Sequence, residues 1–120
     1  MEAGDILTLL LLIPSGVFVA MGIPCSQGWV PPNRLYGFRT RKTLQDPDVW
    51  YPTNRVAGYW AIATGIVTAG VTITTFFARL GLPAAPLATL AAFGVGIAGT
   101  FIHCFLVIRR VTRDKQEAGA

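Results

Sequence analysis

The stretch that decides the fold is VAGYWAIATGIVTAGVTITTFFA, which runs from Val56 to Ala78 without a charged residue. About 20 predominantly apolar residues are enough for a helix to cross the hydrocarbon core of a bilayer. Two further charge-free runs flank this stretch, Ile6–Ile23 before it and Leu80–Ile108 after it. Pro86 lies near the start of the last run. We therefore predict three transmembrane helices, at about residues 6–23, 56–78 and 86–108.

The composition of the chain agrees with lipid as its solvent. Apolar residues make up 52% of the 120 residues and charged residues only 13%, whereas soluble domains carry about 25% charged residues. We expect a single domain over residues 1–120, an all-α membrane protein built as a three-helix transmembrane bundle. A cleaved signal peptide is the alternative for the first run. A signal peptide begins with a basic segment, but this chain begins with the acidic MEAGD, so we expect a retained helix.

The basic residues predict the orientation of the chain, because loops rich in Lys and Arg stay on the cytoplasmic side. The loop 24–55 and the tail 109–120 carry nine of the ten basic residues: Arg34, Arg39, Arg41, Lys42, Arg55, Arg109, Arg110, Arg113 and Lys115. We place both segments in the cytoplasm, and the N-terminus and the turn at Arg79 outside. The net charge of +4 suits anionic lipid headgroups. No segment is long enough to form a folded basic surface for nucleic acid.

Prolines and aspartates divide the loop 24–55. Pro24 is expected to end the first helix. Asp46-Pro47-Asp48 has the residues of a helix start: a capping carboxylate, a proline at the first position and an acid at the positive end of the dipole. Pro52 lies beyond the first turn and either kinks the segment or restarts the helix. We predict a short interfacial helix before the second span, and a frayed polar tail after Thr112.

Within the spans, proline and small residues shape the expected packing. Pro14 is expected to kink the first helix, or to act as a hinge, with the Ser15 hydroxyl compensating for the lost hydrogen bond. Small residues recur at a spacing of four in the second and third spans, at Ala61, Gly65, Ala69, Ala92, Gly96 and Thr100. Such stripes let membrane helices approach closely. The threonines of the second span either bond to their own helix carbonyls or line a polar pore.

Candidate catalytic and metal-binding residues are few. His103, Cys104 and Cys25 are the titratable or thiol groups of the apolar segments, but adjacent residues on a helix point about 100° apart and bind one ion poorly. We expect a neutral histidine bonded to a neighbouring helix or to an interfacial water, no metal and no cofactor. All six acidic residues lie outside the spans, which argues against a proton-driven pump. The sequence contains no catalytic motif, so we do not expect an enzyme.

The polar loop holds the densest chemical cluster, Tyr36-Gly37-Phe38-Arg39-Thr40. Gly37 permits a positive φ between two aromatic anchors. Arg39 offers a planar fork for a phosphate or carboxylate. Two interpretations stay open: the arginines only enforce topology and touch lipid phosphates, or the loop forms a specific site.

The same residues resemble the signature of a family, the SdpI-type small membrane proteins of bacteria. The matching positions are Asn33, Tyr36, Gly37, Arg39, Thr40, Trp50, Asn54 and Gly58. They follow a pattern of the form N-x-x-Y-G-x-R-T and then W-x-x-x-N-x-x-x-G leading into a membrane helix. The resemblance implies a multi-pass protein of the bacterial plasma membrane, with these eight residues as family-motif or partner-binding positions.

The resemblance also implies a class of function, because the namesake of the family is an immunity protein that protects a bacterium from its own secreted killing factor. We therefore expect toxin immunity or membrane-stress signalling, exerted by binding a peptide toxin or a membrane protein partner. A small oligomeric transport or channel-like protein is the first alternative. A structural or regulatory membrane subunit is the second.

Overall fold

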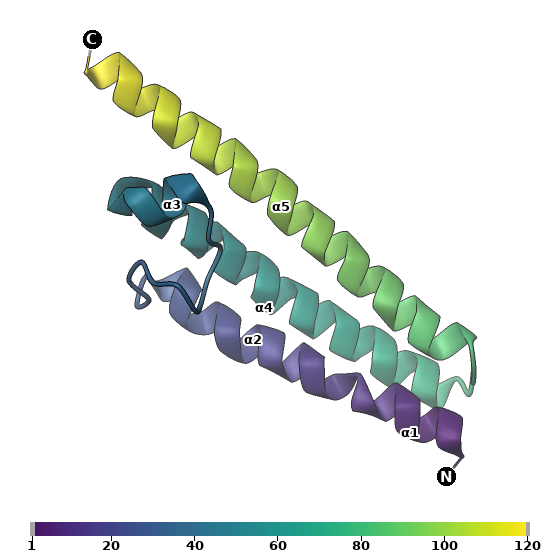
Figure 1. Cartoon of the computed structure of the whole chain (residues 1–120). Helices are drawn as coiled ribbons and strands as arrows, with labels where there is room; N and C mark the ends of the chain where they lie inside the picture. The colour runs from purple at the N-terminus through teal and green to yellow at the C-terminus, as the bar shows by residue number, and fades with distance from the viewer. Residues whose placement is uncertain (1, 120) are drawn as a thin grey trace.

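The computed structural model describes residues 2–119. Within this range the chain forms five helices, α1 (Ala3–Leu10), α2 (Leu12–Gln27), α3 (Arg41–Gln45), α4 (Pro47–Phe77) and α5 (Ala84–Ala118). No strand occurs between residues 2 and 119. The helices form a bundle of 63 × 21 × 19 Å, in which α4 lies between α5 and the rod made of α1 and α2 (Figure 1). The segment containing α3 and the C-terminal end of α5 lie at one end of the bundle, and the N-terminus lies at the other (Figure 1).

The prediction of an all-α protein with three membrane spans is confirmed. Three helical stretches are long and apolar enough to cross a membrane: Ala3–Gln27, Pro47–Phe77 and Ala84–Ala118. Large apolar side chains such as Ile66 and Val95 are exposed on the outside of the bundle. The residues buried on α4 are mainly threonines and glycines. This distribution is suited to lipid, because in a bilayer small residues pack between helices while aliphatic side chains face the acyl chains.

The first span is bent where the proline lies. The helix is interrupted at Leu11, between α1 and α2, because the ring of Pro14 conflicts with the preceding turn and supplies no N–H donor. The Ser15 hydroxyl donates to the Leu11 carbonyl at 3.0 Å and also lies 2.8 Å from the Thr68 hydroxyl of α4. The interruption agrees with the predicted kink, but the Leu11 carbonyl also accepts from the Ser15 N–H, so this bond does not replace the one that Pro14 removes from the Leu10 carbonyl.

The prediction that Pro24 ends this helix is wrong. Helix α2 continues to Gln27 and ends at Gly28, whose φ of 73° is in the left-handed region that glycine adopts at little cost. The Gly28 N–H donates to the Cys25 carbonyl at 3.2 Å, and the Trp29 N–H donates to the Pro24 carbonyl at 3.0 Å. This hydrogen-bonded glycine cap, rather than the proline, terminates the helix.

Helix α4 begins with the predicted aspartate cap, and it then continues as one helix through a proline where the sequence suggested a change. The Asp46 carboxylate accepts from the Asp48 N–H at 2.9 Å, and Pro47 occupies the first turn. The helix then passes through Pro52 without interruption, so a restart of the helix there is ruled out. The missing N–H of Pro52 affects only one carbonyl near the helix start. The short helix before the second span is present, but it is α3 (Arg41–Gln45) and lies upstream of Asp46.

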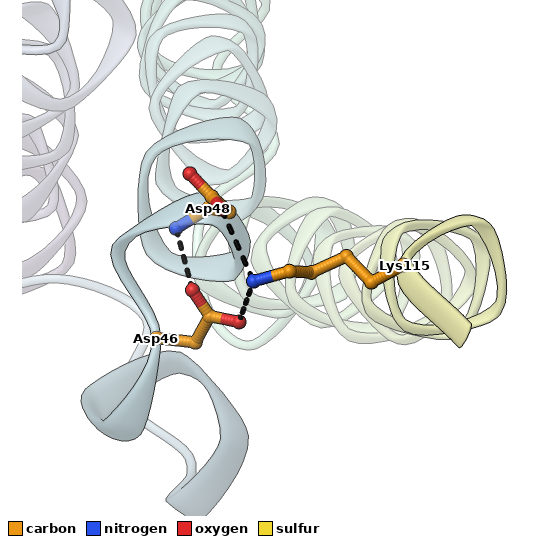
Figure 2. A network of polar contacts seen from close by, with 3 residues as sticks. All are labelled: Asp46, Asp48 and Lys115. Carbon is orange, nitrogen blue, oxygen red and sulfur yellow. Dashed lines mark hydrogen bonds and ion pairs between the residues drawn. The ribbon is translucent and has the colours of Figure 1, made fainter. Parts of the chain in front are cut away.

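The tail is also more ordered than predicted. Helix α5 continues through the polar segment to Ala118, and the expected fraying after Thr112 is wrong. The segment is rich in strong helix formers. In addition, the Lys115 ammonium lies 2.6 Å from a carboxylate oxygen of Asp46 and 3.1 Å from one of Asp48 (Figure 2). These ion pairs connect the end of α5 to the start of α4.

Glycines set the distances between the helices. A Cβ atom added to Gly58 would lie 2.6 Å from the Gly22 carbonyl oxygen, and one added to Gly65 would lie 2.5 Å from the Ser15 carbonyl oxygen. A Cβ atom on Gly96 would overlap the Thr64 side chain. The packing role predicted for Gly65 and Gly96 is therefore confirmed.

Three of the buried threonines of α4 bond to the backbone of their own helix, and two of these also bond to hydroxyls of neighbouring helices. The Thr68 and Thr72 hydroxyls donate to the carbonyls four residues earlier, at 2.7 and 2.8 Å. Thr72 also lies 3.0 Å from the Thr89 hydroxyl of α5. Of the two roles considered for these threonines, the structure supports bonding within and between helices.

Candidate functional site

The candidate site lies in the connector, which is defined here as residues 28–46 between α2 and α4. Its first turn is built by Asn33. The Asn33 side-chain oxygen accepts from the N–H groups of Leu35 and Tyr36 at 2.9 and 2.7 Å, and its amide donates to the Pro31 carbonyl at 2.8 Å. A side-chain amide that bonds to nearby backbone in this way replaces a regular turn.

Tyr36 attaches the connector to the first span. Its hydroxyl donates to the Met21 carbonyl of α2. Burial raises the pKa of the Tyr36 hydroxyl to about 12. The group therefore stays protonated at physiological pH and keeps its ability to donate.

Asn54 of α4 holds the next residues from the other side. Its Oδ1 accepts from the Phe38 N–H at 2.5 Å, while its Nδ2 donates to the Phe38 carbonyl at 3.3 Å and to the Trp50 carbonyl at 3.1 Å. Gly37 precedes this contact with a φ of 110°, as the sequence suggested. A Cβ atom on Gly37 would lie 2.6 Å from the Asn54 oxygen and 3.2 Å from the Trp50 ring. Only glycine fits both the conformation and the space.

The remaining motif residues complete the same unit. Trp50 is fully buried, with 0% exposure, and its indole N–H donates to the Val30 carbonyl at 2.8 Å. Thr40 caps α3, because its hydroxyl accepts from the Thr43 N–H at 3.2 Å. Gly58 lies against the backbone of α2. Trp50, Asn54 and Gly58 therefore share one inward face of α4, as their spacing predicted.

Arg39 is the exception among the motif residues. Its side chain is exposed, and no ion pair or side-chain hydrogen bond involves it within residues 2–119. Six of the other motif residues shape or hold the backbone of the connector, and Gly58 packs against α2. The structure thus gives seven of the eight predicted residues a packing or hydrogen-bonding role and leaves the guanidinium of Arg39 at the surface.

The connector covers a cavity of about 250 Å³ between α2 and α4. The wall is mostly apolar, and Asn54 and Tyr36 contribute to its connector end. The lining residues are Val17, Phe18, Met21, Gly22, Cys25, Tyr36, Gly37, Phe38, Asn54, Ala57, Gly58 and Ala61. Sequence reasoning missed the α2 residues of this wall, because nothing in a uniformly apolar span distinguishes cavity-facing side chains from lipid-facing ones.

The candidate metal ligands lie apart from one another. Cys25 lines the cavity, whereas the Cys104 thiol is buried 3.7 Å from the Thr53 carbonyl. The His103 Nδ1 accepts from the Trp60 indole N–H at 3.0 Å, so the expectation of a histidine bonded to a neighbouring helix is confirmed. Within residues 2–119, no three His, Cys, Asp or Glu residues are grouped so that they could hold a metal ion.

The fold and the connector together define a class: a multi-pass helical membrane protein with one structured polar connector. Residues 30–107 match the sequence model of the SdpI/YfhL protein family. This range contains nearly all of the connector, the whole second span and most of the third, and the chain belongs to that family. The predicted resemblance is therefore confirmed.

One curated relative is similar over about half of the chain. It is the uncharacterized protein YfhL of Bacillus subtilis (strain 168), which is 33% identical over 61 residues. The aligned part covers 51% of this chain and 51% of the relative, so the chain spans about half the length of that protein. No solved structure matches the chain.

Proposed function

We propose that this protein protects a bacterial plasma membrane by binding a membrane-active peptide, and that the cavity beneath the connector is the binding site. The observation that carries the proposal is the position of the motif: six of its eight residues shape or hold the backbone of the connector, and four motif residues line the cavity, namely Tyr36, Gly37, Asn54 and Gly58. Family membership supports an SdpI-like membrane protein. Immunity or membrane-stress signalling is our inference about its role.

The size and lining of the cavity favour a peptide side chain as the occupant. Pockets for drug-sized ligands measure about 300–1,000 Å³, and this cavity measures about 250 Å³. One bulky apolar side chain fits such a space. The donors of Asn54 and Tyr36 at its connector end are bonded within the protein, so they fix the shape of the cavity, and the occupant is held by apolar contact. Arg39, exposed on the connector, can pair with a carboxylate of the same peptide.

Binding rather than transport is the activity that the packing supports. Three buried threonines of α4, namely Thr68, Thr72 and Thr75, bond to their own helix, and the first two also bond to Ser15 and Thr89. Their hydroxyls are therefore not available to line a channel within one chain.

A survival experiment with matched variants tests this proposal. The full-length protein is expressed in a sensitive bacterium, which is challenged with a panel of membrane-active peptides. Ala61→Phe fills the cavity, whereas Ala63→Phe places the same ring on the exposed side of α4. We expect the wild-type protein and Ala63→Phe to protect against at least one peptide, and Ala61→Phe to fail while accumulating to the same level. Absence of protection by the wild-type protein across the panel would overturn the proposal.

A further inference from the structure

A second pocket, separate from the connector cavity, lies between α3 and α5. It measures about 230 Å³ and is lined by Thr40, Arg41, Lys42, Phe105, Ile108 and Arg109. Two of its basic residues come from α3 and the third from α5, which are far apart in the sequence. We propose that this pocket binds an anionic phospholipid, with the phosphate between the basic side chains and the start of an acyl chain on the apolar wall.

The position of the pocket along α5 corresponds to the depth of lipid headgroups. Ile108 is the last residue of the charge-free run, and Arg109 is the first charged residue after it. A helix changes from apolar to basic where it leaves the hydrocarbon core. The pocket therefore lies at the boundary where phosphates meet acyl chains, and it presents both kinds of surface.

The apolar wall is fixed by packing. Ile108 is 3% exposed. The Phe105 ring meets the Phe38 ring edge to face, with 5.9 Å between the centroids. Phe38 is itself held by Asn54, so this wall belongs to the same folded unit as the connector. A free phosphate ion makes no favourable contact with an apolar wall, whereas the acyl chain of a lipid can pack against it.

The positive charge of the pocket is not neutralised by the protein. The nearby acids have other partners: Asp46 and Asp48 pair with Lys115, and Asp114 lies 3.8 Å from Arg113. Among residues 2–119, no ion pair involves Arg41, Lys42 or Arg109. Arginine offers a planar fork that matches phosphate oxygens. Charge complementarity thus favours an anion, and the apolar wall selects an anionic lipid.

Lipid retention by the purified full-length protein tests the inference. The protein in detergent is titrated separately with dioleoyl phosphatidylglycerol, dioleoyl phosphatidylcholine and inorganic phosphate, and bound molecules are counted by native mass spectrometry. The test variant is Arg41→Gln/Arg109→Gln. The control is Arg34→Gln/Arg110→Gln, which removes the same charge from exposed residues outside the pocket. Circular dichroism verifies that both variants remain helical.

We expect phosphatidylglycerol to be retained in preference to phosphatidylcholine. Each basic residue near an anionic headgroup contributes a factor of about five in affinity, so the test variant should weaken phosphatidylglycerol binding about 25-fold. The control should change it less than about two-fold. Equal losses in both variants, or equal retention of the two lipids, would overturn the inference. Displacement of phosphatidylglycerol by an equal concentration of inorganic phosphate would instead identify a free-phosphate site and also overturn it.

Discussion

The side chain of Asn54 holds both polar groups of the Phe38 backbone. Its oxygen accepts from the Phe38 N–H at 2.5 Å, and its nitrogen donates to the Phe38 carbonyl at 3.3 Å. The two residues belong to different parts of the fold, the connector and the core helix α4. This contact fixes the connector over the cavity, and it places Phe38 against Phe101 and Phe105 of α5.

Asn54→Leu should therefore release the connector. The substitution keeps a side chain of similar size but removes both hydrogen bonds to Phe38. Leaving a buried polar group unpaired costs about 1–3 kcal/mol. We expect trypsin to cleave the detergent-solubilised variant faster at Arg39, Arg41 and Lys42. Gln45→Leu, an exposed change in the same connector, is the control, and equal cleavage of the two variants would contradict the role given to Asn54.

Gly65→Leu should prevent close packing of α4 against α2. Even a Cβ atom at this position lies 2.5 Å from the Ser15 carbonyl oxygen, and overpacking against backbone is expected to cost about 3 kcal/mol or more. Gly70→Leu is the matched control, because a Cβ atom at Gly70 meets nothing within 4 Å. The amount of folded protein recovered from membranes measures the effect. Equal recovery of both variants would refute the packing role of Gly65.

Arg39→Lys should reduce peptide protection more than Arg41→Ala does. Arg39 is the motif residue whose charged group is left at the surface, and a lysine cannot reproduce its planar fork. Loss of one charge-assisted hydrogen bond corresponds to about ten-fold weaker binding. The survival assay described above measures the effect. If both substitutions are tolerated equally, the arginines of the connector act as a topology signal alone.

The ion pairs between Lys115 and α4 should be stable over a wide pH range. Hydrogen bonds from Lys115 and from the Asp48 backbone lower the pKa of Asp46 below its usual 3.8, while hydrogen bonds to Asp46 and Asp48 raise the pKa of Lys115 above its usual 10.5. The stabilisation that the ionised Asp46 carboxylate gives to the ion pair is thus fully present above the usual pKa of Asp46. It is lost as the pH falls through the lowered value. The contribution of Lys115 is present below its usual pKa and is lost as the pH rises through the raised value.

A nitroxide at Gln116→Cys reports on this contact through its mobility. We expect constant mobility between about pH 5 and pH 9, where both partners are charged. Lys115→Gln should increase the mobility throughout this range, and Arg113→Gln should not. A change in mobility near neutral pH in the otherwise unchanged protein would contradict the assignment.

Much of the fold is predictable from the sequence because lipid imposes simple rules. The three charge-free runs give three spans, and Asp46-Pro47-Asp48 gives the start of α4. The differences arise where tertiary contacts decide. Gly28 ends α2 in place of Pro24 because its left-handed conformation completes the cap, and α5 extends to Ala118, where Lys115 reaches the carboxylates of α4.

The candidate site is predictable only in part, for a similar reason. The spacing of Trp50, Asn54 and Gly58 places them on one helix face, and the motif groups them with Tyr36 and Gly37. Helix packing decides which α2 residues line the cavity and brings Arg41 and Arg109 to the same pocket. No local sequence pattern predicts this packing.

We propose that the basic end of the three-span bundle, with its folded connector, lies on the cytoplasmic side, because basic loops are retained there. Leu35→Cys places a thiol on the connector at a position that is 91% exposed, and Leu80→Cys places one at the opposite end, at a position that is 53% exposed. The native Cys25 and Cys104 are buried. We predict that a membrane-impermeant maleimide labels Leu80→Cys in intact cells and labels Leu35→Cys only after permeabilisation. Labelling of Leu35→Cys in intact cells would contradict the account.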